Sequence, residues 1–287
     1  MWPARTSRTT TATSSPSVNP WIDEGRSVVE MTVSDGGAGS YPGCPVTVDE
    51  ALAEGRSLRV PRWGLWDVLI AFIGIIALGY LVTVAFPAVI SDDPPAWQLM
   101  IAATLPWLAM AGWPILATAR RGNGARVDLG LRLTWADLGF GAIGGVTAWI
   151  LLGVVALATL ALTGDFTSAA GEVAADLVRD GNRLWLIAFA LAIALGAPIV
   201  EEIFFRGLFY SALRKRGLHD AWVILITAVT FAALHFEPVR LPILLAMGLV
   251  TGVLRWRTRA LGAPIVAHVM VNTPGAILVT MGLSGSA

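Results

Sequence analysis

The chain has 287 residues, 55% of them hydrophobic and 14% charged, with a mean hydropathy of +0.69. Soluble domains average about 25% charged residues, so this composition indicates a polytopic membrane protein. The 20 basic and 20 acidic residues cancel to a net charge of zero, which argues against nucleic acid as a partner because that needs a basic face.

Residues 1–60 form the first segment of the chain and differ from the rest. They are rich in Thr, Ser, Gly and Pro, carry scattered charges of both signs, and show no sustained apolar period. A segment of this kind cannot bury enough apolar surface to fold alone. The sequence therefore predicts a disordered cytoplasmic tail over 1–60.

Seven apolar stretches follow, and each is about long enough to cross a hydrocarbon core of roughly 30 Å. They lie near 66–87, 97–118, 138–162, 184–213, 221–236, 241–256 and 264–283. The sequence thus predicts an all-α bundle of about seven transmembrane helices. We divide it into N-terminal transmembrane helices over 61–183 and a second transmembrane region over 184–287, which carries the polar motifs described next.

Arginine placement orients the predicted helices. If the tail lies in the cytoplasm, most arginines fall on the cytoplasmic side, which is the pattern of the positive-inside rule. The cytoplasmic clusters are Arg56, Arg59 and Arg62; Arg120, Arg121, Arg126 and Arg132; Arg206, Arg214, Lys215 and Arg216; and Arg255, Arg257 and Arg259. We therefore predict a multi-pass protein of the cell membrane with a cytoplasmic N-terminus.

The fourth predicted span carries three charges, Glu201, Glu202 and Arg206, between apolar flanks. An ionised side chain inside a bilayer costs several kcal/mol, roughly 2.5 to 3.5 on insertion scales. Glu202 and Arg206 are four residues apart on one helix face and can neutralise each other, whereas Glu201 is rotated about 100° away. Glu201 is therefore left without a partner nearby in the sequence, although an ion pair that only joins two helices remains the structural alternative for this segment.

Two later spans contain further polar side chains at helical spacing. Phe231 and His235 are four residues apart, as are His268 and Asn272, so each pair shares a helix face. A single histidine in a membrane helix usually serves as an interhelical hydrogen-bonding group. Two of them together with Glu201 favour a shared site, because polar residues inside membranes gather near one another or around water.

These residues carry a resemblance to a known family. EEIFFR fits an EExxxR motif, FAALH fits FxxxH and HVMVN fits HxxxN, in that order on successive predicted helices. In these motifs the region from about 184 to 280 resembles the CPBP family of intramembrane proteases, the CAAX prenyl endopeptidase and bacteriocin-processing group. The first three predicted spans and the tail add no motif to the resemblance.

The resemblance implies hydrolysis of a peptide bond in a membrane-associated protein or peptide, at the surface of or within the lipid bilayer. Glu201 and His235 would activate water, and His268 and Asn272 would stabilise the oxyanion, with Glu202, Arg206 and Phe231 in support. A metalloprotease is the alternative, in which Glu201, His235 and His268 bind Zn²⁺. The choice between zinc and a metal-free mechanism stays open at this point, as does the identity of the substrate.

A proton-coupled membrane transporter is the alternative from another functional class. Glu201, His235 and His268 would then form a proton relay, a role that carboxylate and histidine chains do serve in membranes. The first half of the chain has no second set of interrupted helices, which a transporter built from inverted repeats would have. The sequence therefore favours the protease.

Overall fold

The computed structural model describes residues 44–90 and 94–283, which contain helices and no strand. Six helical stretches are long and apolar enough to cross a membrane: Leu65–Ala85, Ala96–Arg121, Trp135–Thr163, Arg183–Lys215, Leu241–Thr258 and Gly262–Thr280. The remaining predicted span corresponds to a shorter apolar helix, Asp220–Ala233. The predicted all-α membrane bundle is therefore confirmed over the described residues.

The helices are numbered along the chain. The first half contains α2 (Pro45–Ala53), α3 (Leu65–Ala85), the 3₁₀ turn η1 (Pro87–Ile90), α4 (Ala96–Thr104), the π-helical turn η2 (Leu108–Gly112), α5 (Trp113–Arg121), α6 (Ala125–Leu129) and α7 (Trp135–Thr163). The second half contains α8 (Ala169–Asp180), α9 (Arg183–Leu191), the π-helical turn η3 (Ala192–Gly196), α10 (Ala197–Glu202), the π-helical turn η4 (Ile203–Phe209), α11 (Tyr210–Lys215), α12 (Asp220–Ala233), α13 (Leu241–Thr258) and α14 (Gly262–Thr280).

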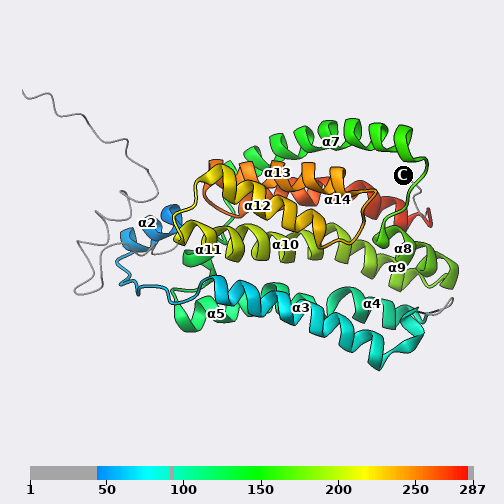
Figure 1. Ribbon diagram of the computed structural model, residues 1–287, viewed down its shortest axis with the longest axis horizontal. Coiled ribbons are helices and arrows are strands. Elements are labelled where there is room, and N and C mark those ends of the chain that lie inside the picture. The colour runs from blue at the N-terminus through cyan, green and yellow to red at the C-terminus, as the bar shows by residue number, and fades with distance from the viewer. Residues whose placement is uncertain (1–43, 91–93, 284–287) are drawn as a thin grey trace, which may run out of the picture.

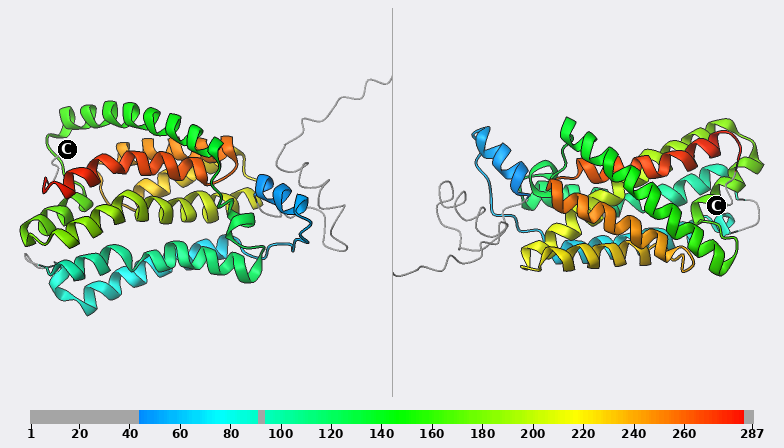
Figure 2. Two further views of the ribbon diagram at one scale, coloured as in Figure 1. Left: turned by 180° about the vertical axis from the view of Figure 1, so that it is seen from behind. Right: turned by 90° about the horizontal axis from the view of Figure 1, so that it is seen from above.

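The spans form layers around one central helix. In Figure 1 the segment from α9 to α11 runs through the middle, with α3, α4 and α5 below it and α12, α13 and α14 above it. The long helix α7 covers α13 and α14 on their outer side, as the two views in Figure 2 also show. The part of the central helix over residues 202–214 is buried by these neighbours, which allows it to carry charges.

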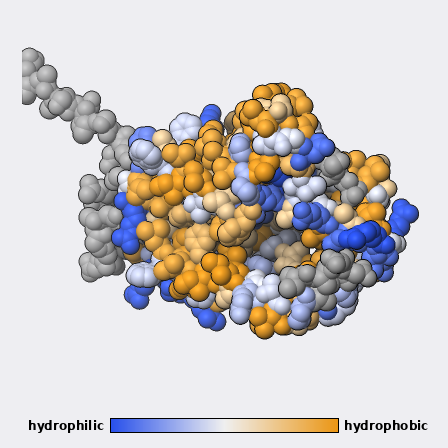
Figure 3. All heavy atoms as spheres, turned by 45° about the vertical axis from the view of Figure 1, so that its right-hand side comes forward, coloured by the Kyte–Doolittle hydropathy of each residue, from blue (hydrophilic) through white to orange (hydrophobic). Residues whose placement is uncertain are grey.

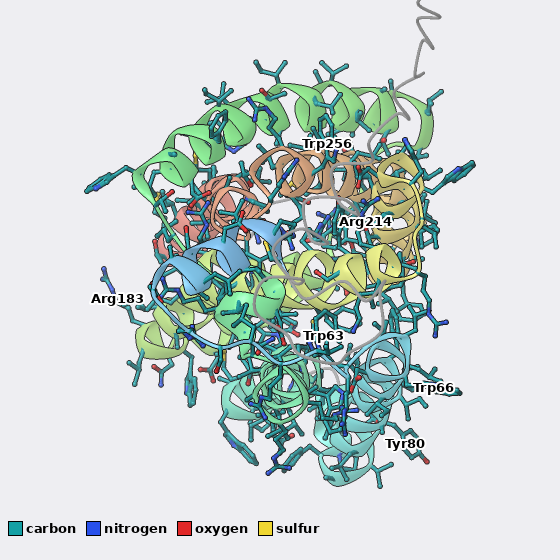
Figure 4. All side chains as sticks on the ribbon, turned by 90° about the vertical axis from the view of Figure 1, so that its left-hand side faces the viewer. Trp63, Trp66, Tyr80, Arg183, Arg214 and Trp256 are labelled. Atoms are coloured by element: carbon teal, nitrogen blue, oxygen red, sulfur yellow. The ribbon has the colours of Figure 1, made fainter. Side chains whose placement is uncertain are left out.

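The outer surface matches a membrane environment. Figure 3 shows apolar side chains over the middle of the molecule and hydrophilic ones toward its ends. In Figure 4, Trp66 and Tyr80 point outward, and they are 73% and 71% exposed, whereas Trp63 and Arg214 lie inside the bundle. Large apolar and aromatic side chains on the outside of a bundle are what lipid contact requires.

Local sequence signals set several helix ends. Thr134 caps α7, because its hydroxyl accepts from the Asp137 N–H at 3.3 Å while Asp137 accepts from the Thr134 N–H at 2.9 Å. The connection after α7 contains α8, the short surface helix, which begins at the Ser168 cap and ends at Gly181 in a left-handed conformation.

The structure differs from the predicted tail over residues 44–60. There α2 packs against the turn around α6, and the Thr47 hydroxyl donates to the Val127 carbonyl at 2.7 Å. An ion pair between Glu50 and Arg132 (3.0 Å) adds to this contact. Within the predicted tail, α2 is therefore stabilised by tertiary contacts that its weak apolar pattern does not reveal. Residues 1–43 lie outside the described residues.

The start of α3 is fixed by a buried polar cluster. Asp128 accepts hydrogen bonds from Trp63 Nε1 at 2.7 Å and from the Asn123 N–H at 2.9 Å. Burial raises the pKa of the Asp128 carboxyl, and these hydrogen bonds oppose that rise. Lys215 lies over the Trp63 ring at 4.3 Å and donates to the Pro61 carbonyl at 3.0 Å, so the cluster joins α3 to α11.

The docking of α2 gives a testable prediction. Val48 is 4% exposed and packs with Ala51 and Val127, so Val48→Asp would bury an unpaired carboxylate. We expect the melting temperature in detergent to fall by about 4 °C or more. The control is Ala53→Asp, at an exposed position of the same helix, which should melt like the wild type. Equal melting of both variants would show that α2 does not contribute to the fold.

Candidate active site

The two glutamates and the arginine of the first motif lie in the centre of the bundle. Glu202 ends α10, and Arg206 lies one turn later in η4, with Arg206 Nη1 at 3.0 Å from Glu202 Oε1. Both side chains are fully buried. Arg206 also donates to the Gly248 carbonyl of α13 at 3.0 Å. The ion pair expected from the spacing is present, and it links the central helix to α13.

Aromatic rings cover the guanidinium group of Arg206. The ring of Phe231 lies 4.8 Å from it and the ring of Phe205 lies 5.7 Å from it. Phe231 also contacts the rings of His235 at 4.7 Å and His268 at 5.9 Å, measured between centroids. Phe231 is thus the apolar surface shared by Arg206 and both histidines, which gives the first residue of the FxxxH motif a physical role.

His268 joins the two adjacent glutamates. Its Nδ1 lies 2.9 Å from Glu202 Oε1, and its Nε2 lies 3.7 Å from Glu201 Oε2. Because a carboxylate only accepts, the short contact puts a proton on Nδ1 of His268 and directs Nε2 toward Glu201. Glu201, which lacks a partner within its own helix, lies next to His268 of α14, and the two form an ion pair only when the imidazole is protonated.

His235 lies in the turn that follows α12, and its Nδ1 is 2.8 Å from the Phe231 carbonyl. Since a carbonyl only accepts, Nδ1 carries the proton and Nε2 keeps its lone pair. Phe236, the next residue, has a left-handed backbone with φ of 55°, an uncommon conformation for a bulky side chain. This strained turn follows the end of α12 at Ala233 and fixes the position of His235.

Asn272 lies one turn after His268 on α14. Its Nδ2 donates to the Ile193 carbonyl of η3 at 2.9 Å. The amide carries two N–H groups, so one remains for a further acceptor. The contact holds α14 against the central helix just before the segment that carries both glutamates.

Burial separates these residues into two groups. Glu202, Arg206 and His268 are buried, whereas Glu201, His235 and Asn272 keep part of their surface accessible. The Glu201 side chain is 18% exposed, compared with 0% for Glu202. The accessible group can meet water and a substrate, and the buried group holds it in position.

The residues of the predicted zinc set do not fit a metal ion as they lie. Within residues 44–90 and 94–283, no group of three or more His, Cys, Asp or Glu side chains is placed to hold a metal. His235 and His268 contact the same Phe231 ring, and the Nδ1 atoms of both form hydrogen bonds, which leaves their Nε2 atoms as the nitrogens that could bind a metal. No step of the chemistry discussed below passes through a metal.

Arg255 is a site-supporting residue that the sequence did not reveal. The sequence places it with Arg257 and Arg259 on the cytoplasmic side, and the structure shows that its side chain is fully buried among the helices. Its Nε donates to the Arg206 carbonyl at 2.8 Å, and its Nη2 lies 3.3 Å from the Leu129 carbonyl. Arg255 thereby fixes the backbone of η4. The signal that could have found it is its spacing from Gly248 and Thr251, which places all three on one buried face of α13.

Comparison with known proteins agrees with this arrangement. Residues 183–274 match the family model described as "Type II CAAX prenyl endopeptidase Rce1-like". The "Putative membrane peptidase YdiL" of Bacillus subtilis (strain 168) is 28% identical over 157 residues, which are 53% of this chain and 58% of that protein. An "Uncharacterized 24.3 kDa protein" of Escherichia coli is 33% identical over 103 residues, 34% of this chain and 48% of that one. No solved structure matches.

The chain spans about half the length of the curated relatives that it matches. The matched region begins at the first residue of α9 and ends two residues after Asn272, so it contains every residue of the site. Residues 183–274, which contain the whole candidate site, are thus similar to the Rce1-like type II CAAX prenyl endopeptidase (CPBP) family.

Proposed function

We propose that this protein is an intramembrane endopeptidase that hydrolyses a peptide bond in a membrane-associated protein or peptide. The observation that carries the proposal is the position of His268, held by buried Glu202 on one side and facing accessible Glu201 on the other. A carboxylate beside an imidazole, with a further histidine and an amide nearby, suits water activation and oxyanion stabilisation. The family match favours this activity over proton-coupled transport.

In the proposed reaction, Glu201 is the general base. It takes a proton from a water molecule whose other hydrogen is accepted by His235 Nε2, and the water oxygen attacks the carbonyl carbon of the substrate. The C–N bond then breaks as Glu201 returns the proton to the leaving amine. The atoms balance, because the water supplies the OH of the new carboxyl end and the H of the new amine end.

His268 and Asn272 are the proposed oxyanion donors. Asn272 has a second N–H beyond the one given to Ile193, and an imidazolium ring donates from both nitrogens, so His268 in that form can serve Glu202 and the oxyanion together. Glu202 and Arg206 would not touch the substrate. Glu202 and Arg206 instead hold His268 in position. Because both side chains are fully buried, water could not replace a hydrogen bond lost between them.

The substrate is proposed by class only. The central segment lies among helices apolar enough to span a membrane, so a substrate must be associated with the lipid bilayer. The arginine pattern supports a cytoplasmic N-terminus. The most direct experiment compares the peptides in cells that express the wild type or Glu201→Gln. Peptides that appear only with the wild type identify the cleavage site, whereas identical peptide sets would contradict a peptidase.

The two adjacent glutamates are predicted to respond differently to the same substitution. Glu201→Gln should abolish cleavage of the peptide so identified and leave the melting temperature unchanged, because an amide cannot accept the proton from water. Glu202→Gln should lower the melting temperature in detergent, since it leaves buried Arg206 without its countercharge, at a cost of about 1 to 3 kcal/mol. Each variant serves as the control for the other.

The opposite pattern would contradict these roles. Cleavage by Glu201→Gln protein at nearly the wild-type rate would show that Glu201 is not the general base. A Glu201→Gln protein that unfolds, beside a stable and inactive Glu202→Gln protein, requires the two roles to be exchanged.

Metal content gives a third prediction. Because no three ligands converge among the described residues, we expect purified protein to hold far less than one zinc per chain. His235→Ala and His268→Ala should lose activity without changing that content. Measurement by elemental analysis, with a known zinc protease prepared in parallel, decides the point. Near-stoichiometric zinc that is lost in both variants would support the metalloprotease alternative instead.

A further inference from the structure

The central helix is broken at η3, immediately before the segment that carries the glutamates. In this turn the Ala197 N–H donates to the Ala192 carbonyl, five residues back, in place of the four of an α-helix. In an α-helix the Ala197 N–H would donate to the Ile193 carbonyl, so this donor is already used by Ala192. In the wider π pattern the donor to Ile193 would be the N–H of residue 198.

Residue 198 is a proline, which has no N–H. The Ile193 carbonyl is thus left without a helical donor in both patterns, within a stretch apolar enough to span a membrane. Leaving such a group unpaired is costly in an apolar environment. Asn272 of α14 supplies the missing donor, because its Nδ2 lies 2.9 Å from the Ile193 oxygen.

We propose that Pro198 is a positioning residue for Asn272. By withholding an N–H, Pro198 leaves the Ile193 carbonyl free to bind one N–H of the Asn272 amide and so fixes the plane of that amide. The second N–H is then held in one direction, as a donor to an oxyanion requires. The consequence for catalysis rests on the proposed function, whereas the coupling between Pro198, Ile193 and Asn272 does not.

The same backbone pattern occurs once more within residues 44–90 and 94–283, in the first half of the chain where the sequence predicts no interrupted helix, and it supplies a matched control. In η2 the Trp113 N–H donates to the Leu108 carbonyl five residues back, and residue 114 is a proline. Ala109 is the counterpart of Ile193 there, and it lies against Gly74 of α3. Pro114→Ala therefore makes the same chemical change in a π-helical turn that does not hold Asn272.

The first test measures cleavage of the peptide identified above. Pro198→Ala supplies an N–H that competes with Asn272 for the Ile193 carbonyl, so kcat should fall by about ten- to hundredfold while KM stays unchanged. Pro114→Ala should leave both constants at the wild-type values. An unchanged kcat in folded Pro198→Ala protein would overturn the proposal. Pro198→Ser, which also supplies the N–H, replaces it if Pro198→Ala does not accumulate.

The second test needs no activity. Asn272→Ala should lower the melting temperature of the wild type by about 2 to 4 °C, because the Ile193 carbonyl loses its partner. In the Pro198→Ala background the same substitution should cost less than half as much, since residue 198 then supplies a donor. Equal losses in the two backgrounds would overturn the coupling. Unequal losses in a protein that cleaves nothing would retain the coupling and reject the peptidase function.

Discussion

The structure depends on one constraint, the need to neutralise the guanidinium group of Arg206 where no water can reach it. Glu202 supplies the countercharge, the Gly248 carbonyl takes a further donor, and Phe231 and Phe205 cover its faces. These partners come from α10, η4, α12 and α13, so satisfying one charge fixes the relative placement of four elements. An unpaired charge in this position costs several kcal/mol, a large fraction of the stability of a typical protein.

The site is built on that neutralised charge. Glu202 Oε1 accepts from both Arg206 and His268, so it fixes the position of α14 relative to the central helix. Arg255 acts on the other side of the same turn by holding the Arg206 carbonyl. The residues that we propose to touch substrate are therefore positioned by residues that do not. This division explains why two neighbouring glutamates in one helix can have different roles.

The sequence predicted those parts of the structure that follow from helical spacing. Glu202 and Arg206 pair because four residues make about one turn, and Phe231 and His235 contact each other for the same reason. The bond between His268 and Glu202 could not be predicted, since it depends on how α14 lies against the central helix. The burial of Arg255 could not be predicted from its charge, because it depends on which face of α13 packs against the central helix. The helix α2 was missed because its contacts are with residues about 80 positions away.

The shortness of α12 has a consequence for the lipid around the protein. Its 14 residues extend about 21 Å, well below the roughly 30 Å of a hydrocarbon core. The bilayer beside it must thin, or headgroups must enter, to avoid leaving the turn after His235 in contact with acyl chains. Hydrolysis consumes a molecule that the membrane interior lacks. A thinner bilayer beside α12 would shorten the path of water from the membrane surface to the depth of His235, where the proposed reaction uses it.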